Sequence, residues 1–212
     1  MAAYKGVAAI RDVQPSFDAR DEDLRKRDRV GRESRPVTKR LAVRVRLAGR
    51  GDVSEIVRVH NASIDASEDL GFGTPREAHT FANVGRLSAA WRAPNVVQKE
   101  QVFAAELDGR VVGYVTVEDR EEDLELVNVD VARDLQGRGI GTALVRFVED
   151  RAKALGRRGV TLGTSRNAAG VPWKSLPWWK HLGYRITHEE ENDWTRSIGP
   201  GVREIRMRKD LG

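Results

Sequence analysis

A chain of 212 residues is long enough for one domain with a sizeable core and for an extension beyond it. Its formal net charge of +5 is unevenly placed, because residues 1–40 hold eleven Lys or Arg and seven Asp or Glu. The basic character therefore belongs to these residues and gives no general reason to expect nucleic acid as a partner. The sequence has no cysteine, which excludes disulfides, cysteine-bound zinc and thiol catalysis.

The sequence also bears on where the protein works. No apolar run approaches the roughly 20 residues that a membrane-spanning helix needs. The mildly apolar first ten residues lack the charge pattern of a secretory signal. We therefore expect a cytoplasmic protein that contacts no membrane, and nothing in the sequence points to a bound metal.

Two regions are predicted. Residues 1–40 are predicted to be a polar, charged extension, because Asp18–Arg40 has so few large apolar side chains that it cannot offset its ordering entropy. Residues 41–212 form the domain. Its first strand is predicted over Leu41–Leu47, where aliphatic residues alternate with Ala or Arg. Asp52, with Glu55 three residues later, is the predicted N-cap of the next helix.

Residues 65–95 carry an acidic group, Asp65, Glu68 and Asp69, then a turn over 71–75 and a predicted helix over 77–91. The acidic group either attracts a cationic amine or is an exposed, charged loop. The later elements are more regular: a hairpin (102–107 and 111–117, turning at Asp108-Gly109), strands at 124–131 and 160–163, helices at 139–155 and 175–181, and a last pair of strands at 184–187 and 202–207.

The segment Gln136–Gly141 lies between a predicted strand and a predicted helix. A helix N-terminus presents unpaired N–H groups, and glycines let a phosphate approach the main chain, while Arg138 can add a charge contact. The spacing of this loop fits neither a Rossmann nor a Walker motif, since Thr142 occupies the third glycine position of the first. Taken alone, the segment is either a phosphate-binding loop or an ordinary strand-to-helix turn.

The surroundings of this loop resemble the GNAT superfamily of acetyltransferases over residues 41–210. The stretches that carry the resemblance are Leu124–Val131, Gln136–Leu144, Asn167 with Val171–Trp173, Leu176–Tyr184 and Glu204–Leu211. The resemblance implies an α/β fold with a mixed, mostly antiparallel sheet of six to seven strands, flanked by helices and splayed between the fourth and fifth strands. It also implies direct transfer of an acetyl group from acetyl-CoA to a primary amine in a ternary complex.

The resemblance assigns a set of residues to acetyl-CoA. The main chain of Val129 and Val131 would hold the pantetheine arm, and Asn167 would contact it, although Asn167 could also be a solvent-facing loop residue. The pyrophosphate would lie on the loop and the first helical turn, at Gln136, Gly137, Arg138, Gly139, Ile140, Gly141 and Thr142. The expected partner is an amine acceptor, either a small molecule or a protein, and we also consider a homodimer.

Glu125 is the candidate catalytic residue. An amine of lysine type is protonated at neutral pH, so a base must remove a proton before attack. Glu125 lies eleven residues before Gln136, the position of the general base in histone-type members of the superfamily. Strand alternation predicts that Glu125 shares a face with Val127, Val129 and Val131, and places the second choices, Asn128 and Asp130, on the other face. The alternative is a glutamate at a strand end pointing to water.

One family feature is absent. Many members have a tyrosine acid four residues before the glycine of the last motif, where this chain has Trp179. Protonation would then come from solvent, His181 or Tyr184, or the enzyme would be slow, or transfer would be lost. A non-catalytic acyl-CoA-binding or regulatory module is therefore the first alternative function, and a nucleic-acid-binding protein the second. Trp173, Trp178 and Trp179 either line a pocket or pack in the core.

Overall fold

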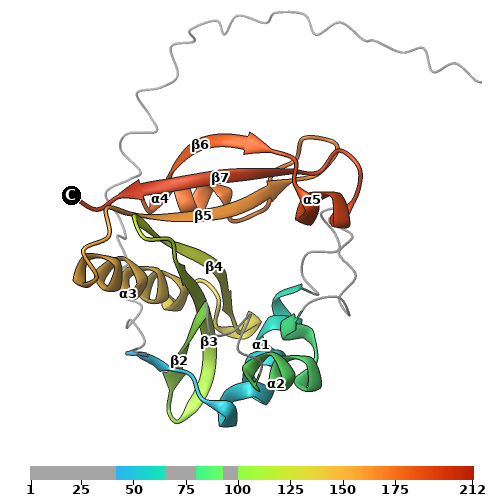
Figure 1. Cartoon of the computed structure of the whole chain (residues 1–212). Helices are drawn as coiled ribbons and strands as arrows, with labels where there is room; N and C mark the ends of the chain where they lie inside the picture. Colours follow the sequence, from blue (N-terminus) through green and yellow to red (C-terminus); the bar gives the residue numbers. More distant parts are fainter. Residues whose placement is uncertain (1–41, 65–79, 93–99) are drawn as a thin grey trace, which may run out of the picture. The chain divides into compact units, whose positions relative to one another are not determined.

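One mixed sheet organises the part of the chain that the structure describes, which is residues 42–64, 80–92 and 100–212 of a computed structural model (Figure 1). These residues all belong to one unit, Lys39–Gly212. The seven strands in these ranges lie in the order β1-β2-β3-β4-β5-β7-β6. Their bounds are β1 Arg44–Leu47, β2 Glu100–Leu107, β3 Arg110–Asp119, β4 Asp123–Val131, β5 Gly159–Arg166, β6 Arg185–Glu190 and β7 Arg203–Asp210. The predicted extension over 1–40, the acidic group at 65–69 and the turn at 71–75 lie outside the described residues.

Only the central pair, β4 and β5, is parallel; the other neighbours are antiparallel. This is the mixed α/β sheet with helices that the sequence predicted. The turn between β2 and β3 also has the predicted form, since Asp108 and Gly109 have positive φ angles of 50° and 77°. The alternation over Leu41–Leu47 predicts a strand with one buried aliphatic face, and this is wrong for Leu47. Leu47 is 63% exposed, because it ends a short strand at the edge of the sheet.

The helices are α1 Val53–Ile64, α2 Val84–Arg92, α3 Ile140–Ala154, α4 Leu176–His181 and α5 Asp193–Ile198. Short 3-10 turns cover η1 Arg50–Asp52, η4 Thr80–Ala82 and η5 Arg133–Leu135. The α1 helix begins directly after Asp52, as predicted, although the Asp52 carboxylate accepts from the Gly49 N–H and from Arg46. The α5 helix was not predicted. No helix in the described ranges is long and apolar enough to cross a membrane.

Two apolar clusters lie on opposite faces of the sheet. On one face α3 packs against β2 to β5 and β7, where Leu144, Val148, Leu162 and Ile205 are fully buried. On the other face α1, with residues of η4 and α2, covers β2 and β3 around Tyr114. The second cluster contains no residue of β5, β6 or β7. The face of these three strands that points away from α3 therefore remains polar.

The sheet opens between β4 and β5. These strands pair only where Asp123–Leu126 meets Gly159–Leu162. Beyond Leu126 the two strands separate, which is plain in Figure 1. A register shift against β3 leaves Val127 as an extra residue at this point, a β-bulge that bends β4 away. The splay that the sequence predicted between the fourth and fifth strands is confirmed.

Candidate functional site

The loop between β4 and α3 leaves the start of a helix without a capping side chain. Gly137 and Gly139 have φ angles of 75° and 87°, a conformation that favours glycine. Gly139 is the N-cap of α3 and makes no side-chain hydrogen bond to it. The first N–H groups of an α-helix have no partner within the helix, so this end of α3 suits an anion such as a phosphate.

The side chains of this loop divide into a buried and an exposed set. Ile140 is buried in the core, so only its main chain can face a ligand, whereas Arg138 is exposed. Gln136 Nε2 donates to the carbonyl of Val131 at 3.1 Å and ties the loop to the end of β4. An added Cβ at Gly141 would lie 3.4 Å from the Trp178 ring, so the first turn of α3, which includes the half-buried Thr142, packs closely there.

The main chain of β4 beyond the bulge has a free edge on the β5 side. Residues 128–131 pair with β3, and none of the residues from Val127 to Val131 has a ladder partner on β5. The N–H of Ala132 donates to Val112, so alternation turns the peptide groups of Val129 and Val131 away from β3. The two residues that the sequence assigned to the pantetheine arm therefore present their peptide groups towards the opening.

The sequence placed Glu125 on the wrong face of β4. Leu124 and Leu126 pack in the same core cluster as Val129 and Val131, on the α3 side. Glu125 lies on the opposite side, because the extra residue Val127 reverses the alternation along the strand. Glu125 thus shares a face with Asn128 and Asp130, the two side chains that were expected opposite it.

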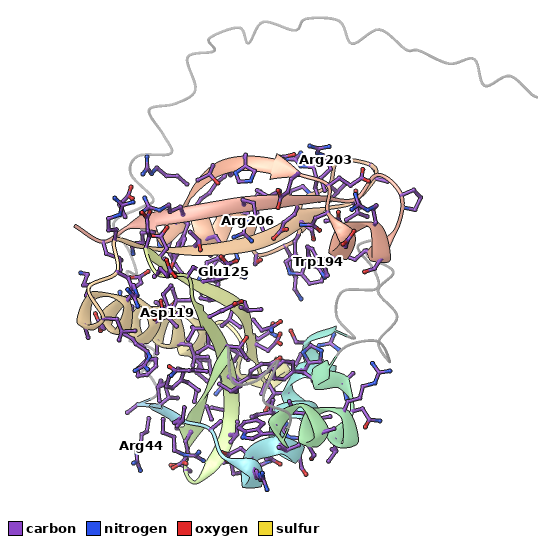
Figure 2. The ribbon with its side chains drawn as sticks, viewed as in Figure 1. Arg44, Asp119, Glu125, Trp194, Arg203 and Arg206 are labelled. Carbon is purple, nitrogen blue, oxygen red and sulfur yellow. The ribbon has the colours of Figure 1, made fainter. Side chains whose placement is uncertain are left out.

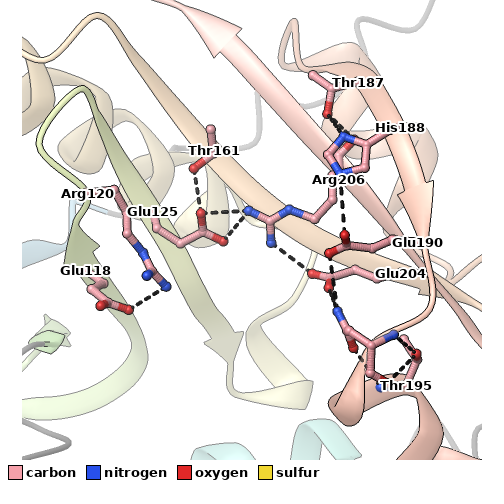
Figure 3. A network of polar contacts seen from close by, with 11 residues as sticks. Glu118, Arg120, Glu125, Thr161, Thr187, His188, Glu190, Thr195, Glu204 and Arg206 are labelled. Atoms are coloured by element: carbon pink, nitrogen blue, oxygen red, sulfur yellow. Dashed lines mark hydrogen bonds and ion pairs between the residues drawn. The ribbon is translucent and has the colours of Figure 1, made fainter.

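Polar partners hold both oxygens of the Glu125 carboxylate (Figure 3). Arg206 Nη2 donates to Oε1 at 2.8 Å and to Oε2 at 2.7 Å. Thr161 Oγ1, on the neighbouring strand β5, donates to Oε2 at 2.6 Å. The side chain is 11% exposed. Glu125 is therefore a held, largely buried carboxylate and not a strand-end side chain turned to water.

Arg206 joins Glu125 to a second carboxylate, that of Glu204. Its Nη1 donates to Glu204 Oε1 at 2.9 Å. Burial lowers the pKa of Arg206, but the hydrogen bonds and charges of Glu204 and Glu125 outweigh it, so the pKa stands above its ordinary value. Asn192 Nδ2 donates to Glu204 Oε2, and Asn192 Oδ1 accepts from the Thr195 N–H at the start of α5. These contacts connect β4, β7 and α5.

An open pocket of about 680 Å³ lies over this network. Figure 2 shows Glu125 and Arg206 on this part of the sheet, with Trp194 on α5 beside it. Acidic side chains outnumber basic ones in the lining, which consists of Arg120, Glu122, Asp123, Glu125, Thr161, Glu190, Asn192, Glu204 and Arg206. Such a lining favours a cation. Within the described ranges, no group of three His, Asp or Glu side chains is arranged to hold a metal ion.

None of the candidate acids lies in this pocket. Trp179 is 4% exposed in the core and contacts Trp178 and Tyr184 with ring centroids 4.3 Å and 5.4 Å apart. Burial and the neighbouring Glu149 raise the pKa of the Tyr184 phenol, so it holds its proton firmly. His181 is exposed on α4. Of the two roles considered for the tryptophans, Trp179 therefore has core packing.

Asn167 closes a tight loop after β5. Its main-chain N–H donates to the carbonyl of Val171, and its side-chain Oδ1 accepts from the Val171 N–H at 2.9 Å. The residue therefore shapes the turn, and its contact with the cofactor arm stays a prediction.

A buried polar cluster that was not predicted from the sequence lies on the face of the sheet that α1 covers. Tyr114 donates to Asp130 Oδ2 at 2.7 Å, and His60 Nδ1 lies 2.8 Å from the Tyr114 hydroxyl. Phe81 stacks on Tyr114 at 5.2 Å between ring centroids. The cluster links α1 to the splayed half of β4, at the point where Asp130 lies.

Sequence reasoning also missed Arg206, Glu204 and Asn192. A signal for the first two was present, because Glu204 and Arg206 alternate in β7 with the buried Ile205 and Met207. Asn192 could have been recognised as an N-cap before α5. The sequence does not show which carboxylate Arg206 meets, since that depends on the order of strands in the sheet.

Comparisons with known proteins agree with this geometry. Residues 67–172 match the model of the acetyltransferase (GNAT) family. "Probable N-acetyltransferase 14" of Xenopus tropicalis is 31% identical over 128 residues, which cover 52% of this chain and 62% of that protein. The chain thus spans less than two thirds of the length of this curated relative.

Solved structures show the same fold. A protein of Desulfovibrio desulfuricans assigned to the GNAT family matches with a TM-score of 0.61 and 21% identity, over 81% of this chain and 100% of the other. The PaiA N-acetyltransferase of Thermoplasma acidophilum, solved in complex with coenzyme A, matches with a TM-score of 0.61 and 15% identity, over 80% and 99%. At these identities the likeness concerns the fold alone.

Proposed function

The chain belongs to the GNAT acetyltransferase family, a family of acyltransferases, and we propose that it moves an acetyl group from acetyl-CoA to a primary amine of a small molecule or protein. The observation that carries this proposal is the opening of the sheet beyond Val127, which leads to a glycine loop and an uncapped helix start. The opening suits an extended arm, and the helix start suits a pyrophosphate.

Acetyl-CoA, the proposed co-substrate, would supply an activated acetyl thioester. The peptide groups of Val129 and Val131 would bind its arm along the free edge of β4. The main chain from Gly137 to Gly141, with Thr142, would bind its phosphates. Gln136 would hold this loop on β4, Arg138 would add charge at the rim, and Asn167 would contact the arm from the turn after β5.

The acceptor amine would bind in the pocket beside Glu125. Its nitrogen forms a bond to the acetyl carbon, the carbon–sulfur bond breaks, and the CoA sulfur leaves as a thiolate. Glu125 accepts the proton that the amine loses, directly or through water. A carboxylate has about four lone-pair sites. Arg206 and Thr161 use three of them, which leaves one on Oε1 for this proton.

The leaving group needs little help. A free thiol has a pKa of roughly 8.5, so a thiolate is a modest base that solvent can protonate. The proposal therefore does not require a tyrosine acid at the position of Trp179. It accounts for a buried Trp179 and for a Tyr184 that is turned into the core.

The test is CoA release over a panel of primary amines, measured for wild type and Glu125→Gln. A general base contributes about 100- to 10,000-fold, so kcat should fall by about that range in the variant. Glu106→Gln is the matched control, because Glu106 also pairs with an arginine, Arg46, but lies outside the pocket. Its kcat should stay within about twofold of wild type.

A non-catalytic acyl-CoA-binding module is the second candidate. The observation that favours it is that both oxygens of Glu125 already have strong partners. Tight CoA binding by calorimetry, together with no turnover of any amine, would establish this module and reject the enzyme.

A further inference from the structure

We propose that Arg206 is a positioning residue for Glu125, and that Glu204 and Asn192 hold Arg206 in turn. This inference rests on the proposed role of Glu125 as the base. It adds a set of residues from β7 and α5 whose effect on the reaction passes through that carboxylate.

The first support is the path of the Arg206 side chain. Arg206 lies on β7 and Glu125 on β4, two strands that β5 separates in the sheet. The residue paired with Arg206 on β5 is Gly163. A Cβ at Gly163 would lie 1.8 Å from Glu204 Oε1 and 3.2 Å from Arg206 Nη1. Because Gly163 has no side chain, the side chains of Arg206 and Glu204 have room to pass over β5, and Arg206 can reach Glu125 on β4.

The second support is the geometry of the ion pairs. A guanidinium is planar, with its donors in a fixed fork, so it fixes the direction of a carboxylate better than an ammonium does. Nη2 of Arg206 donates to both oxygens of Glu125, and Nη1 donates to Glu204, so the rigid guanidinium fixes the two carboxylates relative to each other. Two carboxylates share one cation here. Without Arg206 they would repel each other, and Glu125 would lose its main partner.

The third support is the tether at α5. The side-chain amide of Asn192 makes two hydrogen bonds: Nδ2 donates to Glu204, and Oδ1 accepts from the Thr195 N–H in the first turn of α5. Thr195 completes a reciprocal cap by accepting from the Asn192 N–H at 2.9 Å. The connection between β6 and β7 is thus bonded to the group that holds Glu125. The exposed Trp194 lies on this same helix (Figure 2).

A structural experiment tests the positioning directly and does not depend on activity. Crystal structures of wild type, Arg206→Lys and Arg206→Gln would be compared at Glu125. We expect the Glu125 carboxylate to leave Thr161 in Arg206→Gln. In Arg206→Lys we expect a smaller shift of Glu125, because one ammonium nitrogen must then serve both Glu125 and Glu204. A Glu125 side chain in an unchanged rotamer in both variants would overturn the proposal.

A double-mutant cycle tests the consequence for catalysis. We expect Arg206→Gln to lower kcat by about 10- to 100-fold, since small displacements of a reacting group cost about this much, with the KM for acetyl-CoA within about twofold. In the Glu125→Gln background the same change should alter kcat by less than about twofold. Full additivity would show that Arg206 acts on the substrate independently and would contradict the proposal.

The two proposals fail in different ways. Absence of turnover with any amine in wild type would reject the enzymatic function, and the crystal structures would still decide the positioning. Asn192→Asp adds a matched variant, because aspartate still accepts from the Thr195 N–H but cannot donate to Glu204. We expect Asn192→Asp to lower kcat by about 10-fold and to lower the melting temperature as well, because its carboxylate would lie beside that of Glu204. An unchanged kcat would remove Asn192 from the set.

Discussion

Arg46 and Arg206 are two arginines of the sheet that each bind two carboxylates, and of this pair only Arg206 lines the pocket. Arg46 on β1 contacts Asp52 and Glu106, both at 2.7 Å. Arg206 on β7 contacts Glu125 and Glu204, at 2.7 Å and 2.9 Å. The carboxylate partners raise the pKa of Arg46 above its ordinary value, as they do that of Arg206 against the opposing effect of burial.

The two clusters differ in what their carboxylates can reach. Asp52 and Glu106 belong to the turn after β1 and to its neighbour β2, so the Arg46 cluster braces adjacent segments at the sheet edge. Glu125 comes from β4, two strands away from Arg206, and lines the pocket. The same ion-pair chemistry therefore stabilises local structure in one place and presents a carboxylate to a ligand in the other.

The largest expected difference between the clusters is in stability after loss of the arginine. Arg206→Met would leave Glu125 and Glu204, each 11% exposed, facing each other without a cation. Breaking a buried pair in this way costs about 3 kcal/mol of unfolding free energy. Arg46→Met would leave Asp52 and Glu106, which are 14% and 23% exposed, and should cost about 1 kcal/mol. Urea denaturation at pH 7 measures both.

An equal loss of unfolding free energy in the two variants would contradict this comparison. It would show that loss of the cation costs the Arg206 cluster no more than it costs the Arg46 cluster at the sheet edge. Of the two variants, only Arg206→Met should lower kcat, by the same range of about 10- to 100-fold that is expected for Arg206→Gln. If Arg46→Met also lowered kcat by more than about twofold, the functional separation of the clusters would be wrong.

A smaller difference between the clusters is expected when the glycine beside each one is replaced by alanine. Gly163→Ala would force Glu204 to move, since the new methyl group would lie 1.8 Å from its oxygen. We expect a loss of about 1–2 kcal/mol, typical of overpacking, and a fall in kcat of about 10-fold. Gly49→Ala is the control beside Arg46: its φ is −118° and its Cβ would meet Asp52 at 3.9 Å, an ordinary contact.

Gly49→Ala should leave kcat unchanged. An unaffected kcat in Gly163→Ala as well would mean that Glu204 can move without disturbing Glu125. That result would detach Glu204 from the positioning set while leaving the contact between Arg206 and Glu125 in place.

Local pattern predicted most of the fold. Alternating aliphatic residues located the strands, and Asp108-Gly109 located the hairpin turn, because both depend on near neighbours in sequence. The α5 helix, Asp193–Ile198, was missed because six residues are too few to show a helical period. Its cap at Asn192 was the only local sign.

The site was less predictable, because its decisive features involve pairs of strands. The bulge at Val127 appears only in the register of β4 against β3, and it reverses the side on which Glu125 lies. The meeting of Glu125 with Arg206 needs the strand order β4-β5-β7 and a glycine at position 163. The glycine loop, in contrast, is continuous in sequence, so its position between a strand and a helix was predicted correctly.

The smallest effect concerns the pH dependence of the edge cluster. Hydrogen bonds from Arg46, aided by the Gly49 N–H, hold the pKa of Asp52 below its ordinary value of 3.8 against the opposing effect of burial. The folded state then binds fewer protons than the unfolded state, so this stabilisation is fully present above pH 3.8 and is lost as the pH falls through the folded value. Asp52→Asn should therefore lower the unfolding free energy by about 1 kcal/mol at pH 7, and the difference from wild type should shrink below pH 3.8. In the Arg46→Met background the substitution should lose this pH dependence, because the main cause of the low pKa is gone. If the pH-dependent difference persisted in that background, groups other than Arg46 would cause the low pKa of Asp52. The Arg46 cluster would then not be held by the arginine in the way proposed for the Arg206 cluster.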